Sequence, residues 1–119
     1  MDSLFHDDFE PEYELLPEDV QDELFARIDV LERFGPSLGR PTVDTLTASS
    51  FANMKEIRFN CDGVWRFAFA FDPNRAAIIL CGGDKEDVDQ KKFYKRLIAT
   101  ADARMAAHLT RLKASPEKA

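Results

Sequence analysis

The feature that most constrains the fold is a strict alternation of aromatic and small side chains over residues 64–71, Val-Trp-Arg-Phe-Ala-Phe-Ala-Phe. Successive side chains of a β-strand point to opposite faces of a sheet, so this pattern predicts a strand with one aromatic face. The aromatic face is expected to enter the hydrophobic core. The other face carries Arg66 among small residues, which leaves room for something to lie across it.

Two further runs complete a predicted antiparallel sheet. Residues 54–60 precede the alternating strand, and Asp62-Gly63 between the two runs is typical of a tight hairpin turn. This hairpin allows Arg58 and Arg66 to occupy the same face. Residues 76–81 are continuously apolar, as expected for a strand that is covered on both faces.

Helical patterns flank the predicted sheet. From Pro17 onward, apolar residues recur every three or four positions, which predicts an amphipathic helix of about five turns ending at Gly35-Pro36. Residues 37–50 are rich in turn formers and predict an irregular link, whereas residues 4–6 predict an edge strand. A last helix is expected over roughly residues 88–113, with the apolar stripe Phe93, Leu97, Ala101, Met105, Leu109 and Leu112. The order of these elements is that of an α+β domain.

The length of 119 residues predicts one domain over residues 1–119, with residues 113–119 as a flexible tail. Cys61 and Cys81 lie in strand-like runs without a CxxC motif and are interpreted as reduced, buried thiols. The acidic N-terminus lacks the cationic lead of a signal peptide, and no apolar window reaches the ~18 residues of a membrane span. We therefore expect a cytoplasmic protein without a membrane partner.

The net charge of −6 hides a strong asymmetry along the chain. Residues 1–34 hold twelve acidic and two basic residues, for a net charge of −10, whereas residues 35–119 have a net charge of +4. A pI near 4.9 is unusual for a nucleic-acid binder. The predicted sheet and last helix can nevertheless present a cationic face to phosphates. The acidic segment is either a solvated helix face or a region that docks a partner or gates a substrate.

Cationic side chains and one tyrosine gather on the predicted sheet and at the start of the helix that follows it. Metal-free RNA cleavage requires such a set, because it needs cations to stabilise the phosphorane-like charge and groups that transfer protons. Simpler interpretations stay open: Tyr94 can pack its ring and leave its hydroxyl in water, and a strand arginine can pair with Glu56. His6 and His108 are interpreted as surface or core-edge residues, and no metal site is predicted.

The ordered set of short motifs across the chain resembles the RelE/HigB superfamily of toxins, and more closely its phage-derived HigB-type branch. The resemblance covers residues 4 to about 112, and no single tripeptide carries it. Its motifs are Leu38-Gly-Arg-Pro41, Asp44-Thr-Leu46, Met54-Lys-Glu-Ile-Arg58, Val64-Trp-Arg66, Ala68-Phe-Ala-Phe-Asp-Pro73, Gly83-Asp-Lys85, Phe93-Tyr94 and Ala101-Asp102. It implies N-terminal helices packed on a small, mostly antiparallel sheet that a C-terminal helix closes, which agrees with the elements expected from the residues.

The resemblance also implies a function. The chain would be the toxin of a type II toxin–antitoxin pair, an endoribonuclease that cleaves mRNA during translation without a metal or cofactor. Its partners would be mRNA, the ribosome and a cognate antitoxin, a HigA-type helix-turn-helix protein encoded next to it. The alternative is a non-catalytic protein on the same scaffold, either a ParE-like gyrase inhibitor or a phage accessory factor.

Roles for individual residues follow from the resemblance together with their chemistry. Arg58 and Arg66 would clamp a phosphate, and Lys85 would neutralise phosphates or transfer a proton. Tyr94 would be the base or the leaving-group acid, which requires neighbouring cations to lower its pKa from ~10. Strand parity sends the RNA-binding candidate Lys55 to the face opposite Arg58. The other RNA-binding candidates are Lys91, Lys92 and Lys95.

Overall fold

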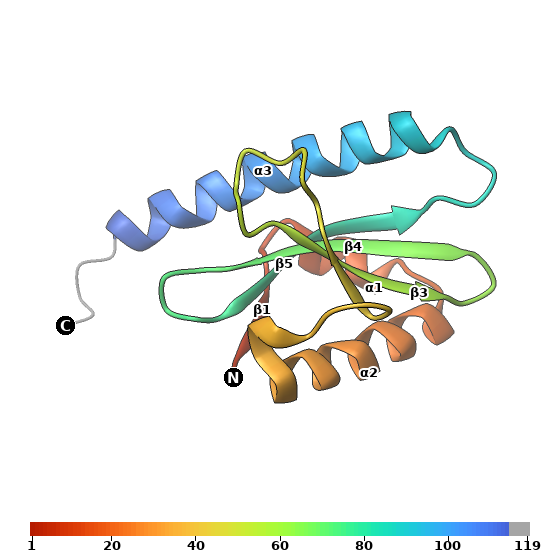
Figure 1. The fold of residues 1–119 in the computed structure, drawn as a ribbon, viewed down its shortest axis with the longest axis horizontal. Helices are drawn as coiled ribbons and strands as arrows, with labels where there is room; N and C mark the ends of the chain where they lie inside the picture. Colours follow the sequence, from red (N-terminus) through yellow and green to blue (C-terminus); the bar gives the residue numbers. More distant parts are fainter. Residues whose placement is uncertain (115–119) are drawn as a thin grey trace.

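The computed structural model describes residues 1–114. In chain order its elements are β1 (Ser3–Phe5), α1 (Phe9–Glu14), α2 (Glu18–Phe34), the short 3-10 helix η1 (Gly35–Ser37), β2 (Val43–Thr45), β3 (Lys55–Asn60), β4 (Val64–Phe71), β5 (Ala77–Asp84) and α3 (Gln90–Ala114). The strands form one five-stranded sheet in the order β1-β5-β4-β3-β2 (Figure 1). The β1–β5 pairing is parallel and the others are antiparallel, which confirms the predicted α+β class with a mostly antiparallel sheet.

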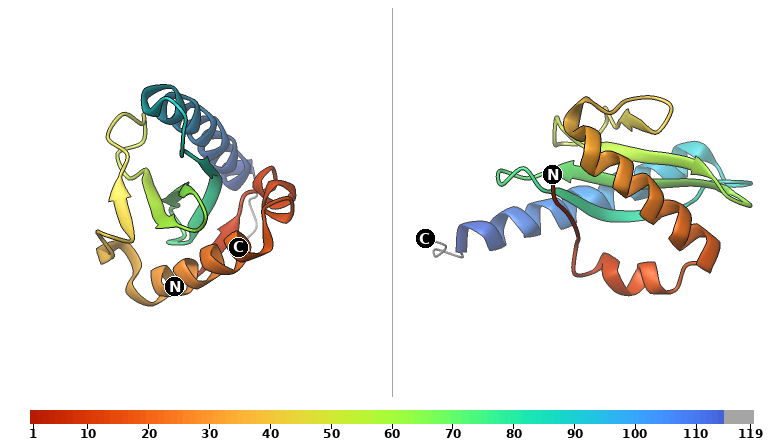
Figure 2. Two further views of the ribbon diagram at one scale, coloured as in Figure 1. Left: turned by 90° about the vertical axis from the view of Figure 1, so that its right-hand side faces the viewer. Right: turned by 90° about the horizontal axis from the view of Figure 1, so that it is seen from below.

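Helices cover both faces of the sheet. The end-on view in Figure 2 shows α2 on one side of the curved sheet and α3 on the other. The core accordingly has two layers. The α2 layer holds the aromatic residues of β4 together with Phe9, Leu24 and Leu31, and the α3 layer holds the small residues of β4 together with Leu97 and Met105.

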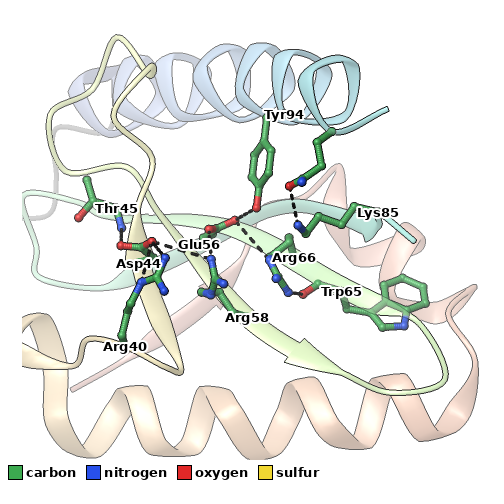
Figure 3. A network of polar contacts seen from close by, with 10 residues as sticks. Arg40, Asp44, Thr45, Glu56, Arg58, Trp65, Arg66, Lys85 and Tyr94 are labelled. Carbon is green, nitrogen blue, oxygen red and sulfur yellow. Dashed lines mark hydrogen bonds and ion pairs between the residues drawn. The ribbon is translucent and has the colours of Figure 1, made fainter. Parts of the chain in front are cut away.

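The alternation of β4 decides which side chains enter which layer. Phe67 and Phe69 are fully buried towards α1 and α2, as the sequence pattern predicts. Ala68 and Ala70 are equally buried, but beneath α3. The room that these alanines leave is therefore filled along most of its length by the chain's own last helix. The end near Arg66 holds a cluster of polar side chains between the sheet and α3 (Figure 3).

Strand β5 continues to Asp84, three residues beyond the apolar run that predicts it, and α3 begins at Gln90 rather than at residue 88. The glycine pair permits this extension: a Cβ on Gly82 would meet the Phe67 ring at 2.0 Å, so only glycine lets the strand pass so close. A register shift opposite Ala68 and Phe69 interrupts the pairing with β4. The expected irregular link contains one short strand, β2, paired with β3.

The structure also shows where the two long helices, α2 and α3, end. Helix α2 ends at Gly35, whose positive φ of 62° and N–H bond to the Leu31 carbonyl form the C-terminal cap. Helix α3 includes residues 113 and 114 of the expected tail, and residues 115–119 lie outside the described part of the chain. Within residues 1–114, no helix combines the length and apolar character needed to cross a membrane.

Candidate functional site

A buried carboxylate, Glu56 on β3, is the centre of a polar cluster between the sheet and the start of α3 (Figure 3). Its Oε1 accepts a hydrogen bond of 2.9 Å from the Tyr94 hydroxyl, and its Oε2 accepts one of 2.9 Å from Arg58. The Arg66 Nε lies 3.9 Å from the same Oε1. Glu56 is only 3% exposed, so the surrounding cations offset the cost of burying its charge.

The two arginines face each other across neighbouring strands. Arg58 and Arg66 are direct partners in the antiparallel register of β3 and β4, so they share one face, as parity predicts. Arg58 is partly exposed, and its Nη1 also lies 3.8 Å from the Asp44 carboxylate. That carboxylate in turn forms an ion pair with Arg40. Both arginines therefore belong to one charged network that runs from the sheet edge to Tyr94 (Figure 3).

Arg66 is the buried member of this pair. It is 6% exposed, and it donates a hydrogen bond of 2.8 Å to the Trp65 carbonyl. Its Nε has no hydrogen-bond partner among the described residues. The nearest anion to this Nε is Glu56, at 3.9 Å, so the Nε stays available as a hydrogen-bond donor.

Tyr94 lies in the first turns of α3 with its hydroxyl directed at the sheet (Figure 3). Burial raises the pKa of Tyr94 above its usual value of 10.0, and the hydrogen bond to Glu56 and the charge of that carboxylate raise it further. The nearby Arg66 acts in the opposite direction and does not outweigh them. The expectation that neighbouring cations lower this pKa is therefore wrong, because a carboxylate is the group that contacts the hydroxyl. Tyr94 is a neutral phenol at physiological pH, suited to donate a proton rather than to accept one.

Lys85 follows β5 and extends towards Tyr94. Its Nζ donates a hydrogen bond of 2.7 Å to the Gln90 side chain and lies 5.6 Å from the centre of the Tyr94 ring. Burial lowers the pKa of Lys85 below 10.5, and the charges of Arg66 and Arg58 lower it further against the opposing charge of Glu56. The structure thus brings together the four residues expected to be catalytic, namely Arg58, Arg66, Lys85 and Tyr94.

The four lysines expected to bind RNA are not gathered in this way. Lys55 pairs in register with Phe69, whose side chain belongs to the α2 layer, so it lies on the face opposite Arg58, as parity predicts. On α3, Lys91 lies about one turn before Tyr94 and is on the same side of the helix. Lys95 directly follows Tyr94 in sequence and lies next to that side. Lys92 lies on the far side, where it lines a different hollow together with Arg96.

Glu56 is the site residue that sequence reasoning missed. It entered that reasoning only as a possible ion-pair partner of an arginine. The alternation of side chains along β3 could have revealed it. Glu56 is two positions from Arg58, so it lies on the otherwise cationic face that carries Arg58 and Arg66. Chemically, the cluster combines a carboxylate that can accept a proton, a phenol that can donate one, and three cations that can stabilise phosphate charge.

The other polar groups considered from the sequence lie elsewhere. His108 contacts Asp72 at 2.9 Å near the far end of α3, and His6 is buried beside β1. Asp102 accepts hydrogen bonds from Ser49 and Ser50, so it holds the loop after β2 against α3. Among residues 1–114, no three histidine, cysteine, aspartate or glutamate side chains are grouped so as to hold a metal ion.

Comparison of the sequence with known proteins places the chain in a family. Residues 12–106 match the family model described as "Phage derived protein Gp49-like (DUF891)". Two Mycobacterium tuberculosis proteins are similar to the chain. "Putative toxin HigB3" is 46% identical over 89 residues, which cover 75% of this chain and 76% of the relative. "Putative toxin HigB2" is 40% identical over 105 residues, which cover 87% of this chain and 52% of the relative, so the chain spans about half of that longer protein.

The family model spans most of the chain, and the matched segment contains the whole Glu56 cluster. The chain therefore belongs to the phage-derived Gp49-like family and, with these relatives, to the HigB-type toxins.

Proposed function

We propose that this toxin is a metal-independent endoribonuclease that cleaves mRNA and so arrests growth. The observation that carries the proposal is the position of the Glu56 carboxylate, which contacts the Tyr94 hydroxyl and lies between two arginines. A carboxylate, a neutral phenol and two guanidinium groups within one cluster are the groups that cleavage by a ribose 2′-hydroxyl requires.

Binding of the RNA phosphate begins the proposed reaction. The partly exposed Arg58 and the buried Arg66 donate hydrogen bonds to the scissile phosphate, which replaces Glu56 as their anionic partner. The Arg66 Nε makes no hydrogen bond within the described residues and would donate one to the phosphate. This exchange releases the Glu56 carboxylate from its ion pairs beside the bound ribose, and Lys85 adds positive charge from the other side.

In the cleavage step, the 2′-oxygen attacks phosphorus while the bond from phosphorus to the 5′-oxygen breaks. Glu56 takes the proton of the 2′-hydroxyl, and Tyr94 gives its proton to the departing 5′-oxygen. The products are a 2′,3′-cyclic phosphate and a 5′-hydroxyl end. The raised pKa of Tyr94 fits the role of acid, because it keeps the phenol protonated until the leaving group needs the proton.

The hydrogen bond between the two groups then restores the enzyme. After cleavage Glu56 is a carboxylic acid and Tyr94 is a phenolate, and their oxygens lie 2.9 Å apart in the free protein. Transfer of the proton from Glu56 to Tyr94 regenerates both starting forms without a solvent-derived proton. A direct contact between the base and the acid therefore has a use in the reaction cycle.

The HigB names of its relatives support an antitoxin partner for this toxin. We propose that it is neutralised by an antitoxin encoded by the neighbouring gene, a small HigA-type helix-turn-helix protein, and that its substrate is mRNA on the translating ribosome. A small helix-turn-helix protein in the same operon would support this pairing.

Induction of the protein alone, followed by growth curves and mapping of mRNA ends, tests the activity. Tyr94→Phe removes only the hydroxyl and should slow cleavage by roughly 10²–10⁴-fold, the usual contribution of a general acid. Arg66→Ala and Glu56→Gln should each relieve the arrest as well. The matched control is Tyr13→Phe, because Tyr13 is the other of the two tyrosines and its hydroxyl donates to the Gln21 carbonyl, outside the Glu56 cluster.

Arrest with intact mRNA, unaffected by all three substitutions in the cluster, would contradict the nuclease proposal. That result would favour the non-catalytic alternative, in which the same scaffold acts by binding a target such as gyrase. Circular dichroism of each purified variant separates loss of activity from loss of folding.

A further inference from the structure

A second hollow, of about 450 Å³, lies between the edge strand β1 and helix α2. Its apolar lining consists of Leu4 and Phe5 from β1 and of Phe25 and Ile28 from α2. Figure 2 shows α2 beneath the sheet, on the side away from α3. This groove is therefore separated by the sheet from the Glu56 cluster.

Large apolar side chains are unusually exposed at this groove. Phe25 is 66% exposed and Leu4 is 53% exposed. Among residues 1–114, five of the six large apolar side chains that are exposed lie in the first 34 residues, so this part of the molecule concentrates its uncovered apolar surface. Apolar surface gathered beside a groove and rimmed by polar residues marks sites of protein association.

The rim of the groove is uniformly acidic. Glu10, Asp29 and Glu32 line it, and within the described residues its lining contains no lysine, arginine or histidine. Glu32 also binds the Ser3 hydroxyl, and Asp29 approaches Arg33 at 3.2 Å on the outer side of α2. The groove lies in the segment whose net charge is −10, so its field repels nucleic acid and attracts a cationic partner.

Strand β1 adds a second element of recognition. It occupies one end of the sheet and pairs, within the described residues, only with β5. An edge strand presents backbone donors and acceptors on its outer side, where a partner segment can bind them. The groove thus combines an apolar floor, acidic side chains and the edge strand of the sheet.

We propose that this groove binds the cognate antitoxin through a segment of the antitoxin that carries both apolar and lysine or arginine side chains. The apolar residues would cover Phe25 and Leu4, and the cations would pair with Asp29 and Glu10. The inference rests on the proposed function for the existence of an antitoxin, and it adds where that protein docks and which chemistry it must present.

The location has a testable consequence. Because the groove and the Glu56 cluster lie on opposite faces of the sheet, the docking contacts can be removed without touching the residues that cleave RNA. A groove variant should stay toxic and escape neutralisation, whereas a site variant such as Tyr94→Phe should lose toxicity and still bind the antitoxin.

The experiment measures binding of the small protein encoded next to this gene to purified full-length variants, by calorimetry. Phe25→Ala and Asp29→Lys should each weaken binding by about tenfold or more, the loss expected for a central contact of an interface. The matched controls are Phe34→Ala and Asp22→Lys, because Phe34 is 61% exposed and both residues belong to α2 without lining the groove. These controls should bind within about twofold of the wild type, a change typical of near-neutral positions.

Equal affinity of Phe25→Ala, Asp29→Lys and the wild type would overturn the inference. So would a wild-type dimer that Phe25→Ala dissociates in light scattering, because a second copy would then be the occupant. If the neighbouring protein fails to bind even the wild type, the inference falls, whereas RNA cleavage and growth arrest by the toxin alone still decide the proposed function. Because Phe25 is mostly exposed, its substitution should leave the unfolding temperature unchanged, which thermal denaturation verifies.

Discussion

At the scale of single residues, the site depends on two pKa values that move in opposite directions from similar starting points. Burial and Glu56 raise the pKa of Tyr94 above 10.0, whereas burial and two arginines lower the pKa of Lys85 below 10.5. Desolvation contributes to both, because it disfavours the phenolate in one case and the ammonium in the other. Lys85 therefore loses its proton at lower pH than an ordinary lysine, and Tyr94 keeps its proton to higher pH than an ordinary tyrosine.

The lowered pKa of Lys85 makes a prediction about the alkaline limb of the pH–rate profile. The kcat/KM for RNA cleavage should fall as pH rises through the pKa of Lys85, because the positive charge that we propose Lys85 places beside the phosphate is then lost. Lys85→Arg keeps its charge to higher pH, so its alkaline limb should move upwards. Cleavage of a short RNA over pH 7–11 measures the shift, with a protein-free reaction as the control for alkaline hydrolysis. An unchanged limb in Lys85→Arg would assign the titration to another group.

At the scale of secondary structure, the alternation in β4 predicts its own strand, its pairing with β3 and the shared face of Arg58 and Arg66. It does not predict what covers that face, because the small size of Ala68 and Ala70 is equally compatible with a bound ligand and with a packed helix. The apolar run of β5 likewise predicts too short a strand, because the strand continues through Gly82, where the neighbouring Phe67 ring leaves no room for a side chain. Such contacts are long-range and leave no local pattern.

The loop after β2 is held to α3 by one carboxylate. Asp102 accepts bonds of 2.5 Å from the Ser49 hydroxyl, 2.6 Å from the Ser50 hydroxyl and 2.9 Å from the Ser50 amide. Partial burial tends to raise the pKa of Asp102, but these hydrogen bonds outweigh it and leave the pKa below 3.8. The carboxylate form is therefore favoured by folding.

Asp102→Asn should lower the free energy of unfolding at pH 7 by about 1–2 kcal/mol, in the range for hydrogen bonds to a charged group. Because the folded pKa lies below the unfolded one, the contribution is complete above about pH 4 and disappears as pH falls through the folded value. The difference between the wild type and Asp102→Asn in urea denaturation should thus shrink from pH 5 to pH 2.5. Asp22→Asn on the exposed surface of α2 serves as the control and should show little difference at any pH.

At the scale of the whole molecule, the sheet separates helix α2 from the candidate site. Helix α2 carries much of the acidic N-terminal charge and packs on one face, and the site arginines lie beneath α3 on the other. The rest of the acidic segment reaches α3, where Glu12 pairs with Arg104 and Asp7 pairs with Arg111. A low overall pI is therefore compatible with a cationic site, because part of the acidic charge lies across the sheet and part is paired with arginines of α3. The charge count along the sequence predicts two regions, but only the folded structure shows where their charges lie.

The candidate site was partly predictable for a related reason. Arg58 and Arg66 follow from parity within one hairpin, whose register is local in sequence. Lys85 and Tyr94 were expected at the site through the family resemblance, and the structure shows how they reach it from β5 and α3. The central position of Glu56 in the cluster was not predictable, because an acidic residue near an arginine in sequence forms an ordinary ion pair far more often than the centre of a cluster. Its contact with Tyr94 joins residues 38 positions apart.

The positions of the lysines around α3 predict the side from which RNA approaches the site. Lys91 and Lys95 lie on or beside the Tyr94 side of α3, whereas Lys92 faces the hollow on the other side and Lys55 the α2 face. Replacing Lys91 and Lys95 together with glutamine should raise KM for RNA and reduce the slope of log(kcat/KM) against log salt concentration by about 1.4, roughly 0.7 for each lost contact to single-stranded RNA. Lys92→Gln, which removes one positive charge next to Lys91 in sequence, should change that slope little. Cleavage rates between 50 and 300 mM salt measure both effects, and equal slopes for the two variants would mean that RNA crosses α3 from the other side.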